Sequence, residues 1–272
     1  MLVKEKMKNN YLVNLRNFDE VSKYEEVGVT TFLLPLKKYC VGYPDTFSWE
    51  EINSLKLKNG KKYCLINAVL DNKSLDEVKN IVATLEVDGF VIEDIGLINV
   101  LKKLQKEVIL FINHFNCNCL SINTWLDYVD SVFVSNELTY LELKEITSKC
   151  QKKVIVHLFG YNQVMYSKRK LLSNYQEYYN LPKNNRDVIT DKMGLVKFRM
   201  YENEEGTVGY SDKIFADSRI LDLSNVYYYY INSSFIELEK VLAFIKDKTV
   251  DDTMDSGFLD KETIFKIGGD SK

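Results

Sequence analysis

The sequence predicts an α/β protein, and within that class a TIM-like (β/α)8 barrel with a long insertion between strands seven and eight. Eight short apolar runs rich in strand-forming residues recur along the chain, and segments with helix-start signals separate them. An open doubly wound sheet is the competing α/β fold. No glycine-rich phosphate loop follows the first run, where such folds usually carry it.

The eight apolar runs show little alternation between apolar and polar residues. This pattern is typical of strands buried on both faces, as in a parallel sheet. In chain order the runs are YLVNL at 11–15, TFLLPL at 31–36, YCLINAVL at 63–70, GFVIED at 89–94, VILFIN at 108–113, SVFVS at 131–135, KVIVHLF at 153–159 and VYYYYINS at 226–233.

Helices are expected between these strands because Ser or Thr recurs three residues before Glu. This is the spacing of a capping box, in which two side chains satisfy unpaired backbone N–H groups at a helix start. The expected pairs are Ser48 with Glu51, Ser74 with Glu77, Thr139 with Glu142 and Ser234 with Glu237.

The insertion occupies residues 160–225. Its second half, VKFRMYENEEGTVGYSDKIF at 196–215, predicts a hairpin that turns near Asn203–Gly206. We expect a single barrel domain over residues 1–248 that includes this insertion, followed by a polar C-terminal tail at 249–272.

Composition narrows the class of protein. The chain has 272 residues, 46% hydrophobic and 28% charged, which is typical of a globular protein. The net charge of −3 gives no overall attraction to nucleic acid, although a local basic patch can still provide one. The N-terminus lacks the apolar core of a signal peptide, no apolar run is long enough to span a membrane, and the five cysteines lack a disulfide framework. These features favour a cytoplasmic protein without membrane contact.

Polar residues follow the strands at the ends where barrel enzymes place their chemistry. They are Asn67, Glu93 with Asp94, Asn113 with His114, Glu137 and His157. One interpretation is a lined pocket. The other is that polar residues simply resume where a buried strand ends.

The segment that follows His157 combines a Tyr with a Ser-Lys-Arg-Lys cluster at 167–170. Arg169 offers a planar fork suited to a phosphate or carboxylate, or the cluster is a solvated helix start. His157 can serve as a general acid or base, or as a structural hydrogen-bonding group.

Two further site types receive little support. His114, Cys117 and Cys119 lie close in sequence, but their spacing matches no common zinc pattern, so no metal is predicted. A triad of Ser167, His157 and Asp94 would need a nucleophile elbow, and nothing in the local sequence resembles one.

One segment, VIVHLFGYNQVMYSKRKLLSNY at 154–175, resembles the signature region of the collagenase-like peptidase U32 family. The shared pattern is a strand ending in His with a nearby Gly, then Tyr-Ser-x-Arg, then Ser-Asn-Tyr. Four other segments are also similar to the family: 61–78, 87–103, 132–146 and 199–215. The resemblance covers about residues 10–245 and implies a barrel-like α/β domain.

This sequence departs from many family members at the cysteines. Members implicated in oxygen-independent hydroxylation carry four cysteines that hold a [4Fe–4S] cluster, two of them in the signature region. The positions aligned with those two are Gln163 and Lys170 here, and neither can replace a thiolate. No cofactor is therefore predicted. The chain is closer to a shorter branch, which in some bacteria works with a longer relative in 5-hydroxylation of the wobble uridine of tRNA.

The resemblance leads to one main hypothesis, that the protein supports tRNA wobble-uridine hydroxylation with a longer, cluster-bearing relative. Its partners would be tRNA and a small anionic cosubstrate. The alternatives are a peptidase of the collagenase-like type and a non-catalytic binding subunit. The candidate catalytic residues are His157, Glu137 and Asp94. The candidate substrate-binding residues are Arg169, Ser167, Asn174, Tyr175, Asn67 and Lys168.

Overall fold

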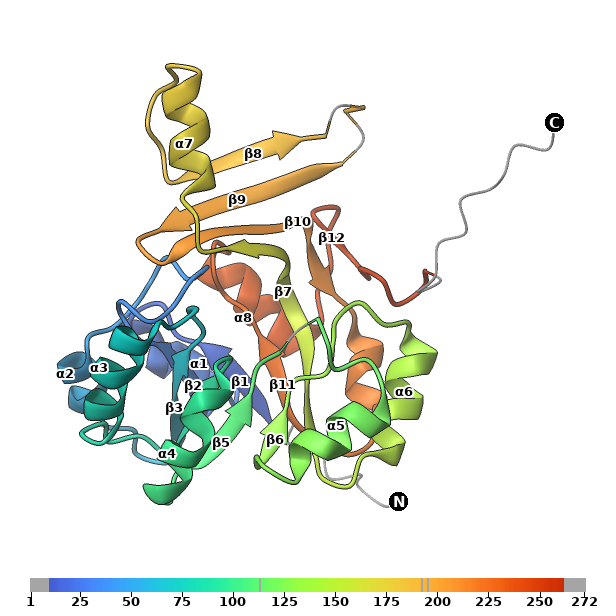
Figure 1. Ribbon diagram of the computed structural model, residues 1–272. Coiled ribbons are helices and arrows are strands. Elements are labelled where there is room, and N and C mark those ends of the chain that lie inside the picture. Colours follow the sequence, from blue (N-terminus) through green and yellow to red (C-terminus); the bar gives the residue numbers. More distant parts are fainter. Residues whose placement is uncertain (1–9, 113, 192, 195, 262–272) are drawn as a thin grey trace.

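Parallel β-strands alternate with helices through most of the chain (Figure 1). The structure is a computed structural model that describes residues 10–112, 114–191, 193–194 and 196–261. Its parallel strands are β1 (Tyr11–Asn14), β2 (Thr31–Pro35), β3 (Lys61–Ile66), β4 (Gly89–Ile92), β5 (Glu107–Leu110), β6 (Ser131–Val132), β7 (Val154–Ser167) and β11 (Val226–Ile231). Each predicted apolar run overlaps one of them, so the positions of the eight predicted strands are confirmed.

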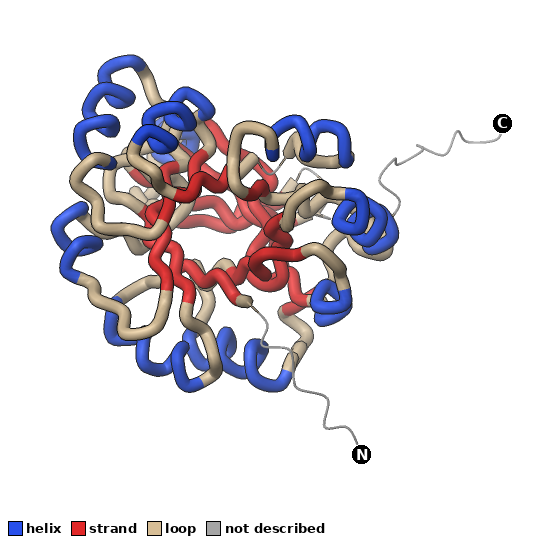
Figure 2. The backbone as a smooth tube through the Cα atoms, turned by 90° about the horizontal axis from the view of Figure 1, so that it is seen from below, coloured by secondary structure: helices blue, strands red, loops and turns tan. Residues whose placement is uncertain are grey.

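Within the described ranges these strands belong to one 12-stranded mixed sheet. The order of its parallel part is β6-β5-β4-β3-β2-β1-β11-β7. No continuous ladder joins β6 to β7. An isolated bridge pairs Phe133 with Ile155, and the Val134 N–H donates to the Ile155 carbonyl at 2.9 Å. Figure 2 shows the strands curving around a common centre with the helices outside them.

Eight α-helices and three 3-10 helices are described. They are η1 (Phe18–Glu20), α1 (Val21–Glu26), α2 (Trp49–Ser54), α3 (Asn72–Val82), η2 (Ile95–Leu97), α4 (Ile98–Lys103), α5 (Cys119–Leu126), α6 (Tyr140–Lys149), α7 (Leu171–Tyr178), η3 (Ser218–Asp222) and α8 (Leu238–Asp247). Among the helices of the described residues, none has both the length and the apolar character needed to cross a bilayer.

The capping predictions had mixed outcomes. The boxes at Ser48 and Thr139 are confirmed, with both reciprocal bonds present. The prediction at Ser74 was wrong because Asp71 caps α3 instead, its carboxylate accepting from the Ser74 N–H at 2.8 Å. The prediction at Ser234 was also wrong, since α8 begins at Leu238 and the Ser234 hydroxyl instead accepts from the Asn14 amide at 3.1 Å.

Both faces of the parallel sheet are apolar, as the strand pattern indicated. One buried cluster fills the concave side, and the larger cluster lies between the sheet and the helices. The concave cluster, here called the interior, contains Leu12, Leu33, Cys40, Tyr43, Tyr63, Leu65, Val91, Ile109, Phe111, Phe133, Ile155, Tyr228 and Tyr230.

The insertion continues the sheet as antiparallel strands. The long strand β7 pairs with β10 (Gly206–Ala216), which pairs with β9 (Lys197–Asn203), which pairs with the edge strand β8 (Arg186–Thr190). The predicted turn at Asn203–Gly206 is confirmed. Gly206 has a φ of +136°, and a Cβ there would collide with the Ser167 carbonyl oxygen.

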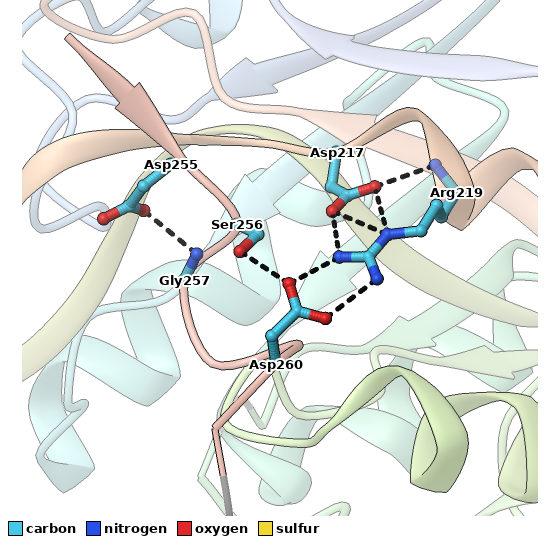
Figure 3. A network of polar contacts seen from close by, with 6 residues as sticks. All are labelled: Asp217, Arg219, Asp255, Ser256, Gly257 and Asp260. Atoms are coloured by element: carbon cyan, nitrogen blue, oxygen red, sulfur yellow. Dashed lines mark hydrogen bonds and ion pairs between the residues drawn. The ribbon is translucent and has the colours of Figure 1, made fainter. Parts of the chain in front are cut away.

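The first part of the predicted tail packs on this sheet. Strand β12 (Met254–Asp255) pairs in parallel with β10. Figure 3 shows Arg219 between two carboxylates, with Nη1 donating to Asp260 Oδ1 at 2.8 Å and Nε to Asp217 Oδ1 at 3.0 Å. Asp260 is thereby tied to η3. Residues 262–272 lie outside the described residues, as does Asn113.

Candidate functional site

The carboxyl ends of the parallel strands meet at the end of the sheet from which β7 continues into the insertion. Successive side chains of a strand point to opposite faces. The residue two positions after an interior residue should therefore also point inward. Val91 is followed at this spacing by Glu93, Ile155 by His157, and Tyr230 by Asn232. We call this end, defined by Asn67, Glu93, His157 and Asn232, the mouth.

A small cavity lies beneath the mouth. Aromatic side chains form most of its wall, and polar groups complete it: the lining residues are Tyr43, Phe111, Phe133, Val134, Asn136, His157, Tyr161, Gln163, Tyr210, Tyr230 and Asn232. Its volume is about 20 Å³, which is room for about one water molecule. A substrate would therefore lie above this cavity, against the residues at its rim.

Glu93 is the carboxyl group that the mouth contains. It is half-buried directly after β4, where its backbone N–H donates to the Ile66 carbonyl at 3.2 Å. Among the described residues its carboxyl group makes no hydrogen bond or ion pair, and burial alone raises its pKa to about 8. A carboxyl group with this pKa is mostly protonated at neutral pH and can donate a hydrogen bond or a proton.

Two tyrosines lie near this carboxyl group, and others line the cavity beneath the mouth. Tyr166 and Tyr210 are close enough for the Glu93 charge to raise their pKa values, after the larger effect of burial. The Tyr43 and Tyr230 hydroxyls share a hydrogen bond of 2.9 Å, and Tyr210 donates to the Gly42 carbonyl. Burial raises the pKa of these phenols, which keeps them neutral as hydrogen-bond donors.

His157 is buried in the same region. Its Nε2 lies 2.8 Å from the Phe159 carbonyl oxygen, so Nε2 carries the proton and donates. Burial lowers its pKa to about 4, although the Phe159 carbonyl and the Asn162 side chain oppose this effect. The geometry fits the interpretation of His157 as a structural hydrogen-bonding group better than that of a general base at neutral pH.

The other predicted strand-end residues hold local structure. Asp94 Oδ1 accepts from the Gly96 N–H at 2.8 Å and caps η2. Asn67 is fully buried and bonds both backbone groups of Val41, at 3.0 and 3.1 Å. It therefore positions the loop after β2 rather than a ligand.

Glu137 pairs with the second histidine. Its Oε1 lies 3.2 Å from His114 Nδ1, and both side chains are more than one third exposed. Neither residue lines the cavity beneath the mouth. The adjacent Asn136 does line this cavity, together with His157.

The predicted substrate-binding residues of the signature region lie on the surface of the insertion. The Ser167 hydroxyl accepts from the Arg169 N–H at 3.2 Å. Lys168, Arg169, Asn174 and Tyr175 are exposed on α7 or the turn before it, and none lines the cavity beneath the mouth. Any ligand they bind would approach from outside the mouth.

Helix α7 is held in place by a buried carboxylate of β9. Glu202 Oε2 accepts from the Leu172 N–H at 2.8 Å and from the Thr207 hydroxyl at 2.7 Å, and Oε1 accepts from the Ser173 N–H at 3.2 Å. These bonds lower the pKa of Glu202, although burial opposes them. They occupy N–H groups at the start of α7 that lack helical partners.

The described residues do not form a ligand set for an iron–sulfur cluster or a metal ion. In the part of the chain that the structure describes, no three His, Cys, Asp or Glu side chains are grouped to hold a metal. Gln163 lines the cavity, while Lys170 Nζ forms an ion pair with Glu204 at 2.8 Å. Neither position offers the thiolate that such a cluster requires.

Sequence reasoning selected Asn67 and His157 but missed other groups at or near the mouth. It noted Glu93 but selected Asp94, and it did not select Tyr43, Tyr166 or Tyr210. Alternation along β4 would have separated the two carboxyl groups, because Val91 and Glu93 share a face. No local signal identifies the tyrosines, which reach the mouth from β7, β10 and the loop after β2.

Comparison with known proteins places this geometry in context. The sequence profile of peptidase family U32 matches residues 16–188. The solved U32 peptidase Mk0906 is 12% identical, with a TM-score of 0.52, covering 86% of this chain and 96% of its own. This likeness shows the fold alone.

Other solved structures are less similar. A chitinase from Chromobacterium violaceum is 8% identical with a TM-score of 0.46, covering 88% of this chain and 98% of its own. The C-terminal domain of a chitinase-like protein from Desulfitobacterium hafniense is 13% identical with a TM-score of 0.40, covering 88% and 97%. No curated protein matches the chain.

Proposed function

Because the chain belongs to peptidase family U32, we propose that it supports 5-hydroxylation of the wobble uridine of tRNA, together with a cluster-bearing relative. The observation that carries this proposal is Glu93, a neutral carboxyl group without a partner among the described residues, at the mouth of the parallel sheet. A protonated carboxyl group offers one O–H donor and one carbonyl acceptor. That pair complements the adjacent N–H and C=O groups on the edge of a uracil ring.

The insertion supports an RNA ligand. Residues 166–200 contain eight Lys and Arg but only three Asp and Glu, in a chain whose net charge is −3. Helix α7 also exposes Tyr175 and Tyr178, with Tyr179 just after it, and the ring of Tyr179 lies 4.8 Å from each of the other two. Basic side chains with exposed aromatic rings suit single-stranded RNA loops.

A partner is part of the proposal. The positions of this chain that align with cluster ligands hold Gln163 and Lys170, so the redox chemistry would come from a cluster-bearing relative. The residues of this chain would bind the loop, orient the uracil and exclude water. Arg169, Lys168 and Tyr175 would contact the RNA outside the mouth. We place this activity in the cytoplasm.

We also interpret the curved sheet as a TIM-like (β/α)8 barrel within one domain, which extends past the expected boundary at residue 248 to include β12. Its support is the arrangement of the parallel strands around a common centre (Figure 2) and the single bridge from Phe133 to Ile155. The antiparallel insertion would then stand at the carboxyl ends of the barrel strands, where such barrels carry their sites.

The peptidase hypothesis finds less support at the mouth. A cysteine or serine nucleophile needs an adjacent base, and burial lowers the pKa of His157 to about 4, which makes its ring a weak base. Burial raises the pKa of Cys40 and Cys64, which disfavours their nucleophilic thiolate forms. The alternative of a non-catalytic binding subunit differs in that the mouth takes no part in the chemistry.

The test is mass spectrometry of tRNA nucleosides from a strain that lacks this gene and a strain complemented with variants. We expect 5-hydroxyuridine derivatives to be lost in the deletion and restored by wild type. Asp94→Asn should restore them because Asn keeps the cap on η2. Glu93→Leu should fail, and Glu93→Gln should restore them if the carboxyl group only orients the base.

Immunoblots confirm that each variant accumulates. An unchanged nucleoside profile in the deletion strain would contradict the proposal as a whole. Full restoration by Glu93→Leu would leave a role in the pathway but remove the mouth from it, and so favour the non-catalytic subunit.

A further inference from the structure

A second hollow lies beside the mouth, between the hairpin strands and the end of β11. It is lined by Tyr161, Arg186, Asp187, Val188, Arg199, Met200, Tyr201, Tyr210 and Phe235, and we call it the arginine groove. Its volume is about 440 Å³, within the range of sites that hold small organic ligands. None of the residues that the sequence selected as substrate-binding lines it.

Arg186 presents unused hydrogen-bond donors in this groove. Its guanidinium carbon lies 4.8 Å from the centre of the Phe235 ring and 5.8 Å from that of Tyr201. Among the described residues, the guanidinium makes no hydrogen bond and no ion pair. The Arg186 charge lowers the pKa of the nearby Asp45 carboxyl group, but burial raises that pKa by more. Among the described residues, Asp45 and Arg186 form no ion pair. The planar fork can therefore accept an oxyanion.

Arg199 differs from Arg186 because the protein already uses its donors. Its Nε donates to the Asp212 carbonyl at 2.8 Å and its Nη2 lies 3.5 Å from Asp212 Oδ1. The guanidinium lies over the ring of Tyr161, 5.1 Å from its centre. Arg199 thus forms a fixed wall of the groove, while Arg186 is the available cation.

Phe235 provides the aromatic floor at a conformational cost. Its φ is +65°, a left-handed conformation that is rare for a bulky side chain. The ring packs against Tyr201 and Tyr210, with centres 5.2 and 5.6 Å away. The surrounding structure therefore holds this ring where it meets Arg186.

We propose that the arginine groove binds one nucleotide of a single-stranded RNA loop, with a phosphate on Arg186 and the base against the aromatic side chains. This inference rests on the proposed function and describes how the same site would hold the RNA. Tyr161 and Tyr210 line both the groove and the cavity beneath the mouth. A nucleotide in the groove therefore places its neighbour in the loop next to the mouth.

The open side of the groove favours a polymer over a small acid. All five residues of the edge strand β8 are exposed, so a chain can continue past Arg186 without obstruction. The surrounding segment carries the excess of Lys and Arg that attracts a phosphate backbone. Aromatic and guanidinium planes bind unpaired bases by stacking.

The test measures binding of a fluorescein-labelled tRNA anticodon stem-loop to the full chain by polarisation. We expect Arg186→Ala to weaken binding by about tenfold and to reduce the salt dependence, because one phosphate contact is lost. Arg186→Lys should have an intermediate effect, since it keeps the charge but loses the fork. Lys103→Ala, which removes an exposed cation of α4, serves as the control and should change affinity less than about twofold.

Two outcomes would overturn the inference. One is binding by Arg186→Ala within about twofold of wild type. The other is an unchanged salt dependence of binding in Arg186→Ala, which would mean that Arg186 contacts no phosphate. These outcomes can be told apart from failure of the proposed function. If only the groove is assigned wrongly, Arg186→Ala still restores 5-hydroxyuridine derivatives in the deletion strain. If the proposed function is wrong, the deletion strain does not lose them.

Discussion

Two carboxyl groups point into the interior from neighbouring strands, one at each end of the sheet. Glu107 begins β5, whose interior residue Ile109 lies two positions further on, and Glu93 follows β4. Glu107 Oε2 accepts from the Tyr63 hydroxyl at 2.7 Å and lies 3.4 Å from Lys61 Nζ. Glu93 has no such partner among the described residues.

The end at Glu107 is closed by a continuous polar network. The Tyr63 hydroxyl also lies 3.3 Å from the Tyr228 hydroxyl, and Lys61 Nζ lies 3.3 Å from the Tyr227 hydroxyl. Networks of this kind stabilise a structure when every member is satisfied. The contrast between Glu107 and Glu93 shows that this fold can provide hydrogen-bond partners for an inward carboxyl group. A carboxyl group without a partner among the described residues therefore distinguishes the mouth from the end at Glu107.

The largest effect should come from breaking the closed end. Glu107→Ala removes the acceptor for Tyr63 and the counter-charge of Lys61, and we expect the free energy of unfolding to fall by about 3 kcal/mol. Urea unfolding at neutral pH measures this change. Glu93→Ala is the matched variant and should cost much less, because it removes a group that has no partner to leave behind.

Equal losses in the free energy of unfolding of the two variants would contradict this difference between the two ends of the sheet. They would mean that Glu93 has a partner of similar strength, and the mouth would then be a structural network like the closed end.

The second effect is a change in how stability depends on pH. The pKa of Glu93 rises from 4.5 to about 8 on folding, so between these values the folded protein holds a proton that the unfolded chain has lost. The stability of the wild type should therefore fall as pH rises from about 5 to 8. Glu93→Gln has no carboxyl group to titrate, so its stability should not fall over this range, and it should exceed that of wild type at pH 9 while differing little at pH 5.

Thermal unfolding at several pH values measures this difference. A constant gap between Glu93→Gln and wild type from acid to alkaline pH would show that Glu93 is ionised at the mouth, and it would exclude the carboxylic acid role.

The strands could be predicted from sequence because each one is a local apolar run. The site could be predicted only in part, because its groups meet through long-range packing. Tyr43 and Tyr230, which share a hydrogen bond at the mouth, are 187 positions apart. The Ser-Lys-Arg-Lys cluster at 167–170 drew attention to Arg169, but that cluster lies between the end of β7 and the start of α7. Arg186 reaches the groove from an edge strand with no motif of its own.

The choice between Asp94 and Glu93 illustrates a second limit on predicting site residues from sequence. Both are carboxyl groups at the end of the same strand, and composition cannot separate them. The two-residue alternation of β4 directs Glu93 inward, while Asp94 turns out of the strand and caps η2. Side-chain direction, rather than residue type, decides which carboxyl group reaches the mouth.

The smallest expected effect is the absence of a titration at His157. Burial lowers its pKa to about 4, so its ring should stay neutral through the range in which an exposed histidine titrates. NMR of the ring protons should show no change in the His157 chemical shifts from about pH 5.5 to 8, and a midpoint near pH 4 if the fold persists there. His114→Asn assigns the signals, since the chain has two histidines. A midpoint near pH 6.5 would mean that water reaches the ring, and His157 would then rejoin Glu93 as a candidate acid or base.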